Sequence, residues 1–181
     1  YKAISLTGWQ IPIVTTEEYG NAKIKYINKQ KILDLFAEKY IVIIAGFQGI
    51  SENLDITTLG RGGSDTTAVA IAASLNADKC EIFTDVDGIF SSDPRVVQNV
   101  KKIDYISYDE MLELSSMGAK VLHNRCVEIG KKYMLPITVK STFEEDSAGT
   151  IVNGKYMEDL TISGVTKDDY IARITVMGLE N

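Results

Sequence analysis

Short runs of aliphatic and β-branched residues alternate along this chain with segments of helical periodicity, and this alternation constrains the fold most. Residues 40–45 and 79–84 have the pattern of strands that are buried on both faces. Residues 29–39 and 68–75 have the pattern of helices, and the second is apolar nearly all round, so we expect it to be buried. Strands that alternate with helices favour βαβ units, so the sequence predicts an α/β fold with a largely parallel sheet.

Weaker patterns extend this prediction along the rest of the chain. A helix is expected from Ser107, because Glu110 follows three residues later as in a capping box, and another from Lys120 to the break at Pro136. Residues 46–63 show no strong helix or strand signal, and a loop of that length inside a compact domain is usually functional. Further strands are predicted at residues 2–7, 22–27, 137–140, 160–165 and 170–177.

Length, charge and cysteine content exclude several classes of protein. At about 150 residues per domain, 181 residues allow one full domain and at most part of a second. A net charge of −6 argues against nucleic-acid binding, which usually requires a basic surface. The longest apolar runs are far shorter than the ~20 residues of a membrane span. Two isolated cysteines, Cys80 and Cys126, form neither a disulfide framework nor a zinc site, so we expect a reducing, cytoplasmic environment.

The first motif with chemical potential is Gly-Arg-Gly-Gly-Ser-Asp at residues 60–65, directly before a predicted helix. Glycines permit positive φ and close approach of the backbone to a ligand, and free N–H groups at a helix start can face an anion. Ser64 is expected to cap the helix, and Arg61 could hold a carboxylate or a phosphate with two hydrogen bonds. A capped helix after a flexible loop would explain the same residues without any ligand.

The second motif, residues 84–95, follows a predicted buried strand and contains Asp85, Asp87 and Asp93. Open α/β sheets bind ligands at the carboxyl ends of their strands, where carboxylates could hold magnesium or nucleotide hydroxyls. Plain turn chemistry is an equal alternative, because Asp-Gly and Asp-Pro both favour turns.

The third motif, residues 118–123, places Lys120 where we expect the next helix to begin, so that its ammonium group and the helix N-terminus would face one anion. A solvated lysine after a glycine C-cap is the alternative for Lys120, and a structural role is favoured for His123.

Together the three motifs resemble the aspartate kinase branch of the amino-acid kinase family. The matching text comprises Thr-Leu-Gly-Arg-Gly-Gly-Ser-Asp-Thr-Thr-Ala at residues 58–68, Thr-Asp-Val-Asp-Gly-Ile at 84–89, Asp-Pro-Arg at 93–95 and Met-Gly-Ala-Lys-Val-Leu-His at 117–123. The resemblance implies a three-layer α/β/α catalytic domain over residues 1–155, with its N-terminal part missing. It also implies the truncated start of an ACT-like regulatory domain over residues 160–181.

The resemblance further implies a reaction, in which ATP and L-aspartate give ADP and 4-phospho-L-aspartate on the route to lysine, threonine and methionine. It implies Mg2+ as a cofactor, lysine or threonine as an allosteric ligand, and a homo-oligomer. The residues that it assigns are Arg61, Gly62, Gly63 and Ser64 for aspartate, with Arg61 on the α-carboxylate; Asp65 and Lys120 for catalysis; and Thr84, Asp85, Phe90, Arg95, Lys120 and Val121 for the nucleotide.

Departures from the family pattern limit the expectation. The family's opening Lys-Phe-Gly-Gly-Thr-type segment and an upstream aspartate-binding glutamate are absent, so this chain alone is expected to be inactive. Phe90, Asn124 and Leu54 stand where relatives often have tyrosine, proline and glycine. Two rival interpretations remain: another amino-acid kinase, acting on glutamate, acetylglutamate or uridylate, or a non-catalytic regulatory subunit.

Overall fold

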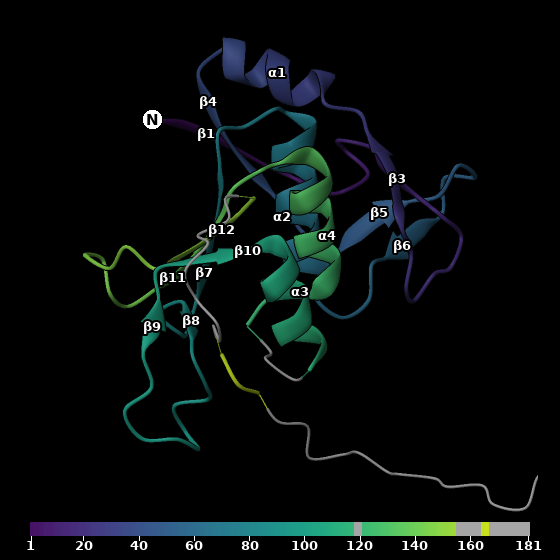
Figure 1. Cartoon of the computed structure of the whole chain (residues 1–181). Helices are drawn as coiled ribbons and strands as arrows, with labels where there is room; N and C mark the ends of the chain where they lie inside the picture. Colours follow the sequence, from purple (N-terminus) through teal and green to yellow (C-terminus); the bar gives the residue numbers. More distant parts are fainter. Residues whose placement is uncertain (118–120, 155–163, 167–181) are drawn as a thin grey trace, which may run out of the picture.

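The computed structural model describes residues 1–117, 121–154 and 164–166 (Figure 1). Its helices are α1 (Gln30–Ala37), α2 (Gly63–Ser74), α3 (Tyr108–Ser116) and α4 (Asn124–Tyr133). Its strands are β1 (Lys2–Leu6), β2 (Ile13–Thr15), β3 (Ile24–Ile27), β4 (Tyr40–Ile44), β5 (Gln48–Ile50), β6 (Ile56–Thr58), β7 (Cys80–Thr84), β8 (Ile89–Phe90), β9 (Lys102–Ile103), β10 (Tyr105–Ser107), β11 (Ile137–Ser141) and β12 (Thr150–Asn153).

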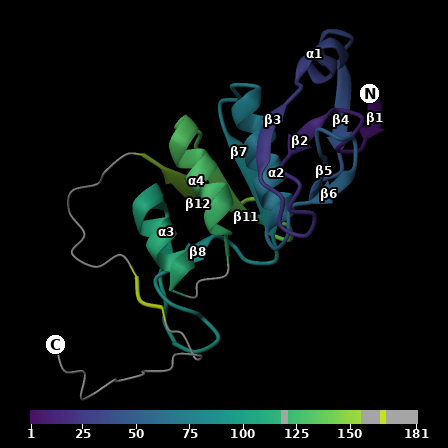
Figure 2. The same ribbon diagram turned by 90° about the vertical axis from the view of Figure 1, so that its right-hand side faces the viewer.

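The strands form mixed sheets in which the long strands pair in parallel. β1 pairs with β4 and β7 pairs with β11, both in parallel, while β12 joins β11 antiparallel and β10 in parallel. A second four-stranded sheet has the order β3-β2-β5-β6, and β8 and β9 form a separate hairpin. In both views α2 stands between the two four-stranded sheets (Figures 1 and 2). The predicted α/β class is confirmed.

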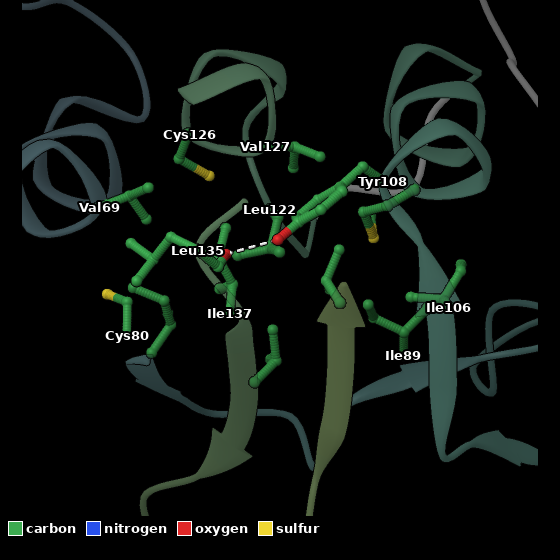
Figure 3. Packing of buried hydrophobic residues seen from close by; sticks show 14 of the residues in the cluster. Val69, Cys80, Ile89, Ile106, Tyr108, Leu122, Cys126, Val127, Leu135 and Ile137 are labelled. Atoms are coloured by element: carbon green, nitrogen blue, oxygen red, sulfur yellow. Dashed lines mark hydrogen bonds between the residues drawn. The ribbon is translucent and has the colours of Figure 1, made fainter. Parts of the chain in front are cut away.

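The larger hydrophobic core lies between helices α2, α3 and α4 and the β10-β12-β11-β7 sheet (Figure 3). Val69 of α2, Val127 of α4 and Ile137 of β11 are all fully buried there. The hydroxyl of Tyr108 donates to the carbonyl of Leu135 at 2.7 Å, which satisfies its only polar group, and burial raises the pKa of this phenol. Residues of α2 and α4 share this core, so the two helices pack against each other.

The prediction that the strands at residues 40–45 and 79–84 are buried on both faces is wrong for the described part of the chain. Ile41, Ile43 and Phe83 are 52%, 55% and 60% exposed. Val42 and Ile44, which alternate with Ile41 and Ile43 along β4, pack against the smaller core. Alternate residues of a strand point to opposite faces. The described residues therefore cover one face of β4 and leave the other open.

Residues 46–63 are not a structureless loop, because they contain the β5–β6 hairpin. Strands of three or four residues can be too short to give a periodic signal, and β2, of three residues, and β12, of four, were missed as well. At the hairpin turn, Leu54 has φ +68°, and its N–H donates to the carbonyl of Ser51 at 3.0 Å. A left-handed residue here accounts for the glycine that relatives often carry.

Other boundaries also differ from prediction. α4 begins at Asn124 rather than at Lys120, and His123 is its N-cap, with an imidazole nitrogen that accepts from the N–H of Arg125 at 3.4 Å. By contrast, the capping box of Ser107 and Glu110 is confirmed at the start of α3. The strands predicted at residues 160–165 and 170–177 lie almost entirely outside the described residues.

Candidate functional site

The start of α2 is built by glycine backbone rather than by a side-chain cap. Gly60 and Gly62 have φ of +76° and +69°, and the N–H of Gly63 donates to the carbonyl of Gly60 at 3.0 Å. Gly62 is the N-cap and supplies no side chain, so the prediction that Ser64 caps the helix is wrong. Ser64 lies in the first turn, where its Oγ donates to Asp65 at 3.4 Å. The N–H of Gly63 is thus already bonded, whereas the next N–H groups, those of Ser64 and Asp65, receive no side-chain cap and can face an anion.

The side chain of His123 packs against this turn at Gly62. A Cβ placed on Gly62 would overlap the Cβ and ring carbons of His123. Only glycine fits at this position, because the backbone has a left-handed conformation and its open side is filled by the imidazole. The start of α4 thus lies directly against the glycine turn.

Two threonines of α2, together with the segment between β4 and β5, also hold the turn. Thr66 and Thr67 donate their hydroxyls to the carbonyls of Gly62 and Gly63 at 2.8 and 2.7 Å. The Thr67 hydroxyl in turn accepts from the N–H of Phe47 at 3.1 Å, and Phe47 itself has φ +71°. Sequence patterns gave no signal for Phe47, because a strained backbone at a bulky residue can be recognised only in the structure.

The charges of this site are arranged to receive an anion. The side chain of Arg61 is exposed and forms no ion pair or hydrogen bond with the residues that the structure describes. Burial raises the pKa of Asp65, an effect that the hydrogen bond from Ser64 and the nearby His123 oppose. An exposed guanidinium and a helix start without a side-chain cap are groups of the kind that bind a carboxylate or a phosphate.

Thr84 and Asp85 lie at the carboxyl end of β7, as the sequence predicts. The Thr84 hydroxyl donates to Asp85 at 3.0 Å. Its carbonyl accepts from the N–H and the hydroxyl of Thr142, at 2.8 and 3.0 Å, just after the neighbouring strand β11. The side chain of Asp85 is exposed at this sheet edge.

Phe90 and Arg95 lie in and after the β8 strand of the hairpin that projects from the main sheet (Figure 1). Phe90 is half-buried, whereas the Arg95 side chain is 86% exposed. The guanidinium of Arg95 makes two bonds to Asp93, at 3.0 and 2.9 Å, and this partner raises the pKa of Arg95. An exposed pair of this kind stabilises little, so a more strongly charged ligand could compete for Arg95.

The third motif is only partly visible. Lys120 lies outside the described residues, whereas Val121 is half-buried against the larger core. Within the described ranges no three histidine, cysteine or acidic side chains gather as a metal cluster. No helix there is long and apolar enough to cross a membrane.

Arg125 is a further residue that sequence reasoning missed. Its guanidinium donates to the carbonyl oxygens of Leu59 and Ala22, at 2.5 and 2.8 Å. These partners are 66 and 103 residues away along the chain, so no local pattern could have predicted them.

Comparisons with known proteins show which family this chain belongs to. Residues 1–141 match the model of the amino acid kinase family. Aspartokinase of Geobacillus stearothermophilus is 52% identical over 181 residues, and aspartokinase 2 of Bacillus subtilis is 51% identical over 180 residues. Each alignment covers 99% of this chain and 44% of the relative, so the chain spans less than half of their length.

Among solved structures, E. coli aspartokinase III in complex with aspartate and ADP superposes with a TM-score of 0.78 at 34% identity. The match covers 86% of this chain and 36% of that one. With its family model matched over residues 1–141 and about half of its residues shared with aspartokinases, the chain belongs to the amino acid kinase family.

Proposed function

We propose that the whole protein containing this chain is an aspartate kinase, which transfers the γ-phosphate of ATP to the side-chain carboxylate of L-aspartate. The observation that carries this proposal is the glycine turn at the start of α2, which has no side-chain cap. Beside it lies Arg61, which is exposed and has no partner among the described residues. It occurs in a chain that is 52% identical to an aspartokinase, and a relative of similar fold binds aspartate and ADP.

The first task of such an enzyme is to bind one small dicarboxylate in a single orientation. Arg61 would clamp the α-carboxylate, Gly62 and Gly63 would let this anion approach the backbone closely, and the N–H of Ser64 would hold it. Burial makes the ionised form of Asp65 costly unless a positive charge lies nearby. This suits a carboxylate that organises nearby lysines.

The second task is to bring a triphosphate against that carboxylate. Thr84, Asp85 and Phe90 would line the nucleotide site, and Arg95 could exchange Asp93 for a phosphate. Phosphoryl transfer needs little covalent help from the protein, so positioning and neutralisation of charge do most of the work. Arg61, Arg95 and Lys120 would supply that positive charge.

Magnesium is compatible with this chain although no three-ligand cluster exists among the described residues. Mg2+ usually takes one or two protein carboxylates and receives its other ligands from phosphates and water. Asp85, exposed at the end of β7, is the side chain that would hold it. When bound, the ion would neutralise phosphate charge.

A substitution at Lys120 tests the proposed reaction in the whole protein. Lys120→Ala should lower kcat far more than it weakens aspartate binding, because a lysine near the phosphates acts mainly in the transition state. The control is Lys132→Ala, since Lys132 is exposed on α4 and lies over the ring of Tyr133. An equal loss of kcat and of aspartate affinity would contradict a phosphate role.

A panel of aspartate, glutamate, acetylglutamate and UMP, with ADP release as the readout, separates this reaction from those of other family members. No turnover with any of the four would instead favour a regulatory subunit.

Several wider properties belong to the same proposal. We expect a three-layer α/β/α domain over residues 1–155, an ACT-like domain beginning at residue 160, a homo-oligomer and a cytosolic location. Inhibition by lysine or threonine is proposed by analogy with a related aspartokinase solved with lysine and aspartate.

A further inference from the structure

We propose that Arg125 is a positioning residue, which orients the Arg61 turn for the acceptor substrate by tying it to the start of α4. This inference rests on the proposed function, because it concerns the same acceptor site. It adds a residue that makes no contact with the acceptor itself and acts only through the backbone of residues 59–62.

Arg125 connects the start of α4 to two other segments, one at Leu59 and one at Ala22. One arm of the guanidinium donates to the carbonyl of Leu59 at 2.5 Å, two residues before Arg61, and the other donates to the carbonyl of Ala22 at 2.8 Å. Leu59 and Ala22 are both fully buried. The N–H of Ala22 donates to the carbonyl of Thr58 at 3.0 Å, so the two segments that Arg125 contacts are also hydrogen-bonded to each other.

A second contact of α4 lies on the other side of Arg61. His123, two residues before Arg125, fills the space against Gly62. The start of α4 therefore contacts the turn at Leu59 and at Gly62, and Arg61 projects from the short stretch between these two points. Movement of either contact would change the direction in which the Arg61 side chain leaves the backbone.

The choice of residue also indicates positioning rather than charge pairing. Among the described residues, the guanidinium of Arg125 has no acidic partner and is shared between two neutral carbonyls. A planar fork with fixed donor directions can hold two acceptors at a set angle, which a lysine ammonium does not do. Positioning within about 0.5 Å is what substrate orientation requires.

The test measures steady-state kinetics of the whole protein with Arg125→Met and Arg125→Lys. Arg125→Met should raise the KM for aspartate about 10- to 100-fold, which is the effect expected if a misoriented Arg61 loses one or two charged hydrogen bonds to the substrate. It should leave the KM for ATP within about twofold. Arg125→Lys should fall between Arg125→Met and wild type, because it keeps the charge but loses the fork. If Arg125→Met does not fold, the Arg125→Lys result decides alone.

Lys29→Met is a matched control. Lys29 also donates from a half-buried cation to a backbone carbonyl, that of Ser74 at 2.8 Å, but at the far end of α2. Lys29→Met should leave the KM for aspartate and the KM for ATP unchanged. The inference is overturned if the wild type is active and both Arg125 variants have the same KM for aspartate as the wild type. It is also overturned if the KM for ATP rises as much as the KM for aspartate. A wild type that does not phosphorylate aspartate would overturn the proposed function instead.

Discussion

Replacing Gly62 by alanine is the sharpest available test of the glycine turn. The residue has φ +69°, and an alanine would place a methyl group in the space that His123 occupies. A left-handed non-glycine residue costs about 1–2 kcal/mol, and overpacking of a filled site costs about 1–3 kcal/mol. The free energy of unfolding should therefore fall by about 2–5 kcal/mol, which is a large part of typical domain stability.

Thermal unfolding followed by circular dichroism measures this loss. At about 2–4 °C per kcal/mol for a chain of this size, the Tm should fall by about 4–20 °C. Gly20→Ala is the control, because a Cβ there meets no atom within 4 Å and the backbone is not left-handed. Its effect should stay within about 1 kcal/mol and could be stabilising.

A second substitution separates the two contributions. His123→Ala should not relieve the clash in Gly62→Ala, because the nearest atom is the Cβ that alanine retains. His123→Gly should restore the steric part and leave the backbone part, and glycine is an acceptable N-cap. The reasoning is refuted if Gly62→Ala costs no more than Gly20→Ala, or if His123→Ala relieves the double variant as well as His123→Gly does.

Two further substitutions test local electrostatics and backbone strain. Hydrogen bonds with Ser147 and Lys102 lower the pKa of Asp87, so its stabilisation should be present above the unfolded-state pKa near 4 and lost as pH falls through the folded-state pKa. Urea unfolding should show Asp87→Asn about 1–3 kcal/mol less stable at pH 7, with the difference shrinking below pH 4; a constant difference would contradict this. Leu54→Gly should raise stability by up to about 1 kcal/mol, because it removes strain at φ +68° in an exposed turn, and a fall in Tm would contradict that account.

Features that depend on neighbouring residues could be predicted from the sequence alone. The capping box of Ser107 and Glu110 was correct because both partners lie within one helical turn. The α/β class followed from local runs of β-branched residues between helical segments. The glycines before α2 were recognised because glycine is the residue that adopts positive φ most readily, so its presence alone indicates such a turn.

Features that depend on which distant segments meet were decided only by the tertiary structure. Arg125 binds carbonyls 66 and 103 residues away, and Gly62 must be glycine partly because His123 packs against it. Likewise, Ile41 and Ile43 have the sequence of a fully buried strand, yet burial depends on what covers each face. Hydrophobicity and propensity belong to single residues and their neighbours, whereas packing and long-range hydrogen bonds belong to pairs that only the folded chain brings together.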